Sequence, residues 1–245
     1  MSQHIPIVVV GPEPSPEKHA ATLVFIHGFR SDMKSAWMSN PKSDNTFWPE
    51  WVSQTYSNLL VLNVGYPSAS GEEGASVYAH AKSIFSKLNT SEQDAFSKPF
   101  VFVCHSMGGL IAKQIIVSNQ DDDQFMNNLR GVIFFATPHA GSPIASKRLT
   151  ITLGQGMVRK EIYDLTLNSS YISFLDEIYL NLKRSDNQYW EHISFFEQKK
   201  TGFVWIVPEV SAKLTDTAND NHGLHKDHSG VSKCLGTDDA GYAQF

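Results

Sequence analysis

A serine between a strand-like run and a helix-like run is the residue in this chain best suited to do chemistry. Residues 100–104 form an apolar, β-rich run and residues 108–117 an apolar helical segment, with Ser106 in the tight turn between them. Such a turn lifts the serine hydroxyl above a sheet and needs small residues two positions before and after it. Gly108 is small, and compact Cys104 stands where the strict pattern has glycine. We therefore predict that Ser106 is a nucleophile.

A serine nucleophile needs backbone N–H donors that stabilise the negatively charged oxygen of the intermediate. The Met107 amide, at the start of the expected helix, is one candidate, because helix N-termini carry free N–H groups. The second is the Phe29 amide, in the loop that follows another apolar run and contains Gly28. We interpret His27 as a structural residue of this loop. Arg30 is either a surface residue, which we favour, or a contact to a substrate oxygen.

The serine also needs a base, and the chain contains ten histidines. In hydrolases with this strand–turn–helix motif the chain order is serine, acid, histidine, with the histidine after the last strand. His228 is the chosen base, because residues 226–233 read as a loop that enters a last helix. His222 and His225 remain alternatives.

The acid of such a triad holds the imidazole in place and is expected just past a strand. Glu209 follows the β-rich run 203–207 by two residues and is the leading candidate. Four aspartates remain alternatives: Asp164, Asp176, Asp216 and Asp220.

Short β-rich runs alternate with helical stretches along the chain. This order predicts an α/β fold, a mostly parallel central sheet with helices on both faces. Ligands of such sheets bind outside the carboxyl ends of the strands, where the residues above are found. The runs are residues 5–10, 22–27, 59–64, 100–104, 132–136 and 203–207.

Two stretches interrupt this alternation. Residues 31–54 are irregular and contain Trp37, which either lines an acyl pocket or belongs to the core. Residues 145–198 carry an amphipathic helical pattern, which we interpret as a helical cap; the alternative is that its helices pack on the flank of the sheet. His139, in the loop after the fifth run, is a further candidate for substrate contact.

Length and composition bound the remaining possibilities. The 245 residues, 41% of them hydrophobic, favour one domain over 1–245. No apolar run is long enough to cross a membrane, and a net charge of −5 without a basic stripe argues against nucleic-acid binding. The start lacks a signal-peptide pattern and there are only two cysteines, so we expect a cytoplasmic protein, assumed monomeric, that needs no cofactor or metal.

Several motifs together resemble one branch of the α/β-hydrolases, which includes the serine-active-site-containing protein and, more distantly, the GPI inositol-deacylases. The resemblance spans most of the chain and implies a serine hydrolase acting on carboxylic esters, including lipid esters. It also implies the roles given to Ser106, His228 and Glu209. The matching segments are 27–28, 35–37, 47–51, 65–68, 105–110, 134–142, 207–212 and 228 with 233.

The residues therefore predict an esterase or lipase that forms an acyl-enzyme on Ser106, with short to medium acyl esters as substrates. A thioesterase or acyltransferase with the same triad is the alternative within catalysis. A non-catalytic α/β-hydrolase-like interaction module is the alternative outside it.

Overall fold

One seven-stranded sheet organises the protein in the computed structural model, which describes residues 5–15, 17–68, 75–90, 94–147, 160–185, 190–214, 220–239 and 241–243. The strand order is β1-β3-β2-β4-β5-β6-β7. Only β1 is antiparallel to its neighbour, and every other pair is parallel. The strands are β1 (Ile7–Val9), β2 (Ala21–Ile26), β3 (Leu59–Val64), β4 (Phe100–His105), β5 (Leu129–Phe135), β6 (Glu191–Glu197) and β7 (Asn221–Leu224).

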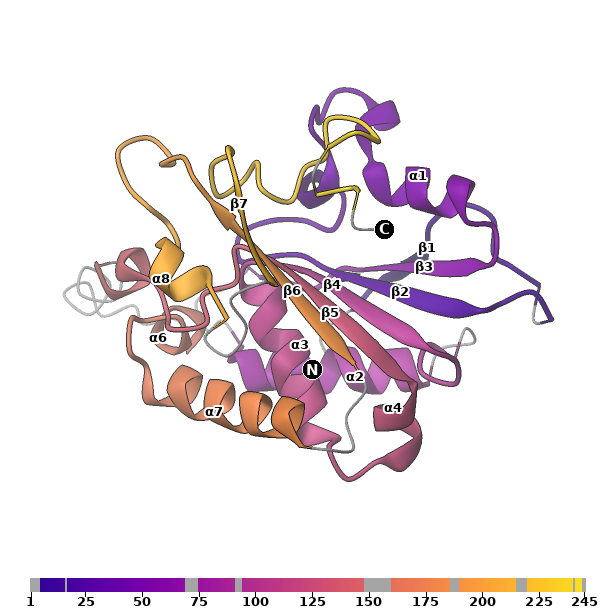
Figure 1. Ribbon diagram of the computed structural model, residues 1–245, viewed down its shortest axis with the longest axis horizontal. Helices are drawn as coiled ribbons and strands as arrows, with labels where there is room; N and C mark the ends of the chain where they lie inside the picture. Colours follow the sequence, from indigo (N-terminus) through magenta and orange to yellow (C-terminus); the bar gives the residue numbers. More distant parts are fainter. Residues whose placement is uncertain are drawn as a thin grey trace.

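Helices cover both faces of this sheet (Figure 1). One face carries α1 (Trp48–Thr55) with the short 3-10 turns η1 (Ser35–Trp37) and η2 (Asp44–Thr46). The opposite face carries α2 (Val77–Asn89), α3 (Met107–Ser118), α4 (Asp123–Asn128) and α7 (Ser170–Arg184). The short helices α6 (Lys160–Asp164) and α8 (Glu209–Ala212) lie near one end of the strands.

The central strands are apolar throughout because both of their faces are buried. Alternate side chains of a strand point to opposite faces, and in β2 they enter two different cores. Val24 and Ile26 belong to the core beneath α2 and α3, whereas Leu23 and Phe25 pack with the tryptophans of the other face. The first five predicted strands are therefore found in the structure, and the α/β prediction is confirmed.

The sixth predicted strand is wrong. Residues 203–207 are not a strand of the sheet; they follow β6 in a loop, and Phe203 is 96% exposed. The sheet instead uses Glu191–Glu197, which pairs with β5 on one side and β7 on the other. β-Propensity misled here because it measures fit to a half-buried pleated surface, and 203–207 has no neighbouring strand to supply one.

The position of β6 in the sheet also changes the interpretation of residues 145–198 as a cap. Its last part is β6, inside the sheet, and α7 packs against α3 on the sheet flank, as the alternative interpretation held. Residues 148–159 and 186–189 of this stretch lie outside the described residues. The expectation of one domain over 1–245 stays a prediction. Within the described residues, no helix is long and apolar enough to span a bilayer.

Candidate active site

The turn between β4 and α3 holds Ser106 in an unusual backbone conformation, with φ 54° and ψ −123°. A positive φ is strained for a side-chain-bearing residue and persists only where the surroundings enforce it. The Ser106 N–H donates to the Phe135 carbonyl over 2.8 Å, and the Ser106 carbonyl accepts from the Gly109 N–H over 3.0 Å. The predicted nucleophile thus lies at the strained turn that such a serine requires.

Small residues around this turn let α3 approach the end of β2. A Cβ placed on Gly108 would lie 2.2 Å from the Ile26 carbonyl oxygen and 2.7 Å from that of His27. Both are backbone atoms, which cannot move aside. Cys104 is fully buried beneath the turn, and burial raises the pKa of its thiol well above the usual range, as expected of a packing residue.

His228 meets the serine from the far end of the chain. Its Nε2 lies 3.1 Å from Ser106 Oγ, within hydrogen-bond distance. The segment around it is a series of turns, with the Gly230 and Val231 amides bonded to the Asp227 carbonyl, and not the predicted last helix. The alternative bases lie elsewhere: His222 is on β7, against Phe195, and His225 lines a separate pocket with Trp205 and Glu209.

Several hydrogen bonds connect the segment that carries His228 to the rest of the protein. His105 Nε2 donates to the His228 carbonyl over 2.9 Å. Trp48 Nε1 donates to the Ser232 carbonyl over 2.8 Å, and Ser232 Oγ donates to the Ala36 carbonyl over 2.9 Å. The irregular stretch 31–54 therefore supports the segment that carries His228.

Trp37 lies within this supporting core and does not contact the pocket. It is fully buried between Phe25 and Trp48, with ring centroids at 5.2 and 5.8 Å. The interpretation of Trp37 as a substrate contact is therefore wrong, and its alternative as a core residue holds.

A carboxylate that the sequence analysis missed faces His228. Glu197, the last residue of β6, is buried, and its Oε2 lies 3.6 Å from His228 Nδ1. Its Oε1 accepts the Val207 N–H over 2.7 Å, which fixes the carboxylate. A carboxylate at the end of a strand is the signal that could have identified Glu197, but residues 191–197 were predicted to belong to the cap.

The structure does not bring Glu209 to His228. Glu209 is the first residue of α8, its side chain is 56% exposed, and it forms an ion pair with Lys213 one turn later. Because the predicted strand 203–207 lies later in the chain than β6, the expected acid was also placed too late in the chain.

The alternative acids are also engaged elsewhere or lie outside the description. Asp164 accepts the Val77 N–H over 2.9 Å at the start of α2, and Asp176 pairs with buried Lys113. Asp220 directly precedes β7, and Asp216 lies outside the described residues.

The loop after β2 lies against Ser106. A Cβ on Gly28 would be 2.8 Å from Ser106 Cβ, so the loop that contains Phe29 passes close to Ser106. His27 holds this loop: its Nδ1 donates to the Gly28 carbonyl over 2.9 Å, and its ring stacks on Tyr66 at 4.3 Å. Burial lowers the pKa of His27 to about 4, so the ring is neutral at pH 7.

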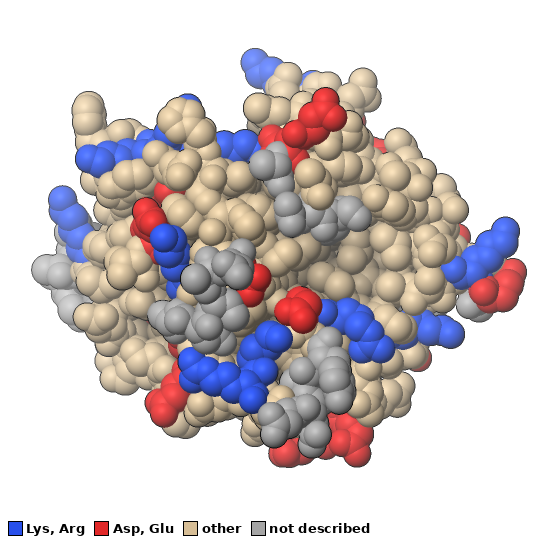
Figure 2. Space-filling model, in the orientation of Figure 1, with Lys and Arg blue, Asp and Glu red and all other residues tan. Residues whose placement is uncertain are grey.

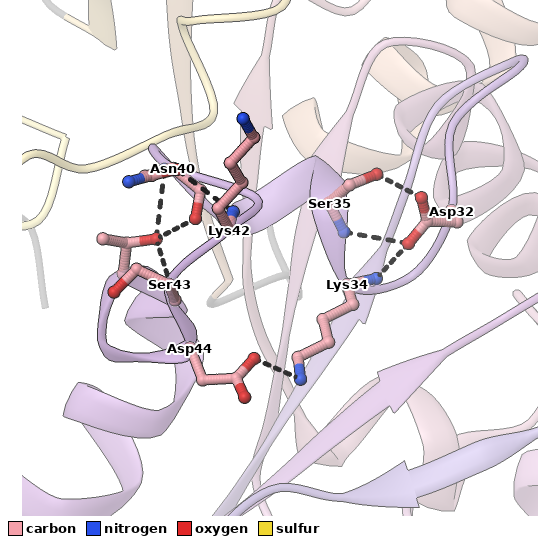
Figure 3. A network of polar contacts seen from close by, with 8 residues as sticks. Asp32, Lys34, Ser35, Asn40, Lys42, Ser43 and Asp44 are labelled. Carbon is pink, nitrogen blue, oxygen red and sulfur yellow. Dashed lines mark hydrogen bonds and ion pairs between the residues drawn. The ribbon is translucent and has the colours of Figure 1, made fainter.

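A network of polar contacts shapes the chain beyond this loop (Figure 3). Asp32 Oδ1 accepts the N–H groups of Lys34 and Ser35, each over 2.9 Å. The Lys34 ammonium then pairs with Asp44 over 2.7 Å. These contacts link the residues after the oxyanion loop to η2, close to the start of α1.

A cavity of about 270 Å³ opens beside Ser106. Most of its surface is apolar, and α6, the loop after β2 and the segment 201–207 form its walls. The residues that line it are Phe29, Arg30, Ser106, Pro138, Ser142, Ile144, Ala145, Ile162, Leu165, Thr201, Ile206, Val207, His228 and Ser229.

Of the candidate substrate contacts, only Arg30 lines this cavity. His139 does not: its ring is buried edge-on against Phe134, 4.9 Å away, and it lines a separate surface pocket beside α7. Burial lowers the pKa of His139 well below its usual value. The interpretation of His139 as a contact in the Ser106 pocket is therefore wrong.

The described residues contain no group of three or more His, Cys, Asp or Glu side chains arranged to hold a metal ion. Residues 215–219, which belong to a stretch rich in Asn, Asp and His, lie outside the described residues.

Comparisons with solved structures identify the fold. The mature lipase BlEst2 of Bacillus licheniformis superposes with a TM-score of 0.64 over 94% of both chains, at 16% sequence identity. The phospholipase PlaB of Legionella pneumophila, solved with thio-NAD, superposes with a TM-score of 0.58 over 79% of this chain and 44% of its own, also at 16% identity. At this level of identity the likeness establishes the α/β-hydrolase fold alone.

Sequence relatives and a family model extend the comparison. The human protein SERAC1 is 25% identical over 221 residues and the mouse protein 23% over 223 residues, in each case across 79% of this chain. The chain covers only 33% of either relative. The model of the PGAP1-like alpha/beta domain matches residues 73–217, more than half of the chain. The chain therefore belongs to the PGAP1-like alpha/beta domain family.

Proposed function

We propose that this protein is a serine carboxylic-ester hydrolase that works through Ser106, His228 and Glu197. The observation that carries the proposal is the 3.1 Å contact between His228 Nε2 and Ser106 Oγ, with a buried carboxylate on the other ring nitrogen. A base between a serine hydroxyl and a carboxylate is the arrangement that activates serine for acyl transfer.

Acylation begins when Ser106 Oγ attacks the ester carbonyl and its proton passes to His228 Nε2. The imidazolium is stabilised by the Glu197 carboxylate, which lies 3.6 Å from Nδ1 and whose other oxygen is held by the Val207 N–H. His228 then gives the proton to the leaving alcohol, and an acyl-enzyme remains. Water, deprotonated by the same imidazole, attacks the acyl-enzyme and releases the carboxylic acid.

The negative charge of each tetrahedral intermediate needs fixed donors. We assign this role to the backbone N–H groups of Met107 and Phe29. Met107 begins α3, so its N–H has no partner within the helix, and the Phe29 loop lies against Ser106. Donors preorganised in this way typically contribute about 3 kcal/mol each to the transition state.

The cavity supports short to medium acyl chains as substrates. Its volume of about 270 Å³ lies just below the ~300–1,000 Å³ range of ligand pockets. Apolar side chains such as Ile162 and Leu165 face an acyl chain, and Arg30 lies where it can meet a polar group of the ester.

Replacement of Ser106 by alanine tests the proposal. We expect hydrolysis of p-nitrophenyl acetate to fall by about 10⁴-fold or more, because the triad acts as a unit. A fluorophosphonate probe labels the wild type and not this variant. The matched control is Ser229→Ala, which removes an exposed serine of the same cavity and retains labelling. Near-normal hydrolysis by Ser106→Ala would rule out Ser106 as the nucleophile.

A further inference from the structure

The connection between β6 and α8 forms a hairpin with exposed apolar side chains. Thr201 and Val204 exchange backbone hydrogen bonds of 3.0 and 3.4 Å, which close the turn. Phe203 at the tip is 96% exposed, and Val204 and Trp205 beside it are 44% and 36% exposed. Figure 1 shows this connection at the upper left, extending beyond the end of the sheet. An aromatic side chain this exposed stabilises nothing within the fold.

The hairpin also carries positive charge. Lys199 and Lys200 directly precede the turn, and both are exposed. The nearby acidic residue Glu209 is paired with Lys213, so it does not cancel this charge. In Figure 2, blue Lys and Arg side chains border uncharged surface at the upper left, where Figure 1 draws the same connection.

The other side of this hairpin belongs to the active site. Thr201, Ile206 and Val207 line the cavity beside Ser106, and the Val207 N–H holds the carboxylate of Glu197. The surface that carries Phe203 is therefore continuous with the wall of the cavity. A molecule bound to the hairpin lies at the cavity mouth.

We propose that residues 199–205, the interfacial hairpin, dock on an anionic lipid surface. Phe203 enters the acyl layer, and Lys199 and Lys200 contact the lipid phosphates. The combination of an exposed aromatic tip with flanking cations fits this occupant, since apolar burial and attraction to anionic headgroups add. The inference rests on the proposed function, because docking brings acyl esters to the mouth of the Ser106 cavity.

Co-sedimentation with phosphatidylcholine vesicles, with and without phosphatidylserine, tests the proposal. We expect the wild type to bind the phosphatidylserine vesicles more tightly. Phe203→Ser lowers that binding by about tenfold or more through lost apolar burial. Lys199→Glu with Lys200→Glu lowers it by at least about 25-fold, or fivefold for each lysine removed.

Matched controls lie at the opposite end of the strands, before β2, β3 and β4. Tyr56→Ser removes a partly exposed aromatic there, and Lys18→Glu with Lys98→Glu makes the same change in net charge. Both controls bind vesicles like the wild type. Phe203→Ser also hydrolyses p-nitrophenyl acetate at the wild-type rate, because Phe203 does not line the cavity.

Three results would overturn the inference: no binding of the wild type to anionic vesicles, equal binding by Phe203→Ser, or a wild-type dimer that Phe203→Ser turns into a monomer. The last result would assign the hairpin to self-association. Ser106→Ala separates this inference from the proposed function, because it binds vesicles normally whether or not Ser106 is the nucleophile.

Discussion

The turn that holds Ser106 and the segments that hold Glu197 and His228 are built in opposite ways. Ser106 and Met107 lie within one strand–turn–helix, and consecutive residues of β4 and α3 determine their geometry. Glu197 and His228 come from separate segments that meet through β6, the turns after β7 and the core around Trp48. Local sequence therefore determines the first region, and tertiary packing determines the second.

The two regions also differ in the titratable groups that they bury. Around the turn, buried His27 and His105 are neutral, because burial lowers the pKa of both rings. In the other region Glu197 is buried beside His228, which becomes charged in the mechanism that we propose. The separation of 3.6 Å between Glu197 Oε2 and His228 Nδ1 is longer than a hydrogen bond, and such contacts often tighten when substrate binds.

The sharpest test of this contrast compares two glutamates. We expect Glu197→Gln to lower kcat for p-nitrophenyl acetate by about 10³- to 10⁴-fold, because the amide cannot stabilise the imidazolium. Glu209→Gln is the matched control and retains activity within about twofold, since its carboxylate only pairs with exposed Lys213. If Glu209→Gln were the crippled variant, the acid assignment would be wrong.

At the turn that holds Ser106, we expect a substitution to destabilise the fold through a steric clash. Gly108→Ala places a Cβ 2.2 Å from the Ile26 carbonyl oxygen, and neither backbone can yield. We expect a loss of more than about 4 kcal/mol in the free energy of unfolding, measured by urea denaturation. Gly236→Ala is the control, because a Cβ there meets nothing within 4 Å. Equal stability of the two variants would contradict this close approach.

The difference between the regions explains what the sequence could predict. The turn at Ser106 was predictable because its small residues and apolar flanks are consecutive. His228 followed from chain order, although the predicted helix beyond it is a series of turns. Glu197 was missed because β6 has the mixed sequence EHISFFE, whereas the more strand-like run 203–207 lies outside the sheet. Which run joins the sheet depends on pairing with β5 and β7, which no local pattern contains.

Acidification should weaken the region around the nucleophile turn. The pKa of His27 is lowered from 6.5 to about 4 in the folded protein by burial. The unfolded chain therefore takes up a proton below pH 6.5 that the folded chain refuses until about pH 4. This histidine's contribution to stability is complete above pH 6.5 and is lost as the pH falls toward 4, by about 3 kcal/mol in all.

Urea denaturation between pH 7 and pH 4.5 measures this loss. His27→Gln should flatten the dependence of the unfolding free energy on pH by about 1.4 kcal/mol per pH unit in that window. His222→Gln, the same substitution at an exposed position on β7, is the matched control. An unchanged slope in His27→Gln would show that this ring is protonated in the folded protein.

The smallest effect concerns the long-range support of the base. Ser232→Ala removes the hydrogen bond to the Ala36 carbonyl, 2.9 Å in length, and leaves a buried acceptor without it. We expect a loss of about 1 to 2 kcal/mol in the free energy of unfolding. Ser185→Ala is the control, since it removes a 2.9 Å bond to the Leu182 carbonyl at an exposed position and should cost less than about 0.5 kcal/mol. Equal costs would mean that the segment carrying His228 is held by its own turns, and that the core of residues 31–54 does not support it.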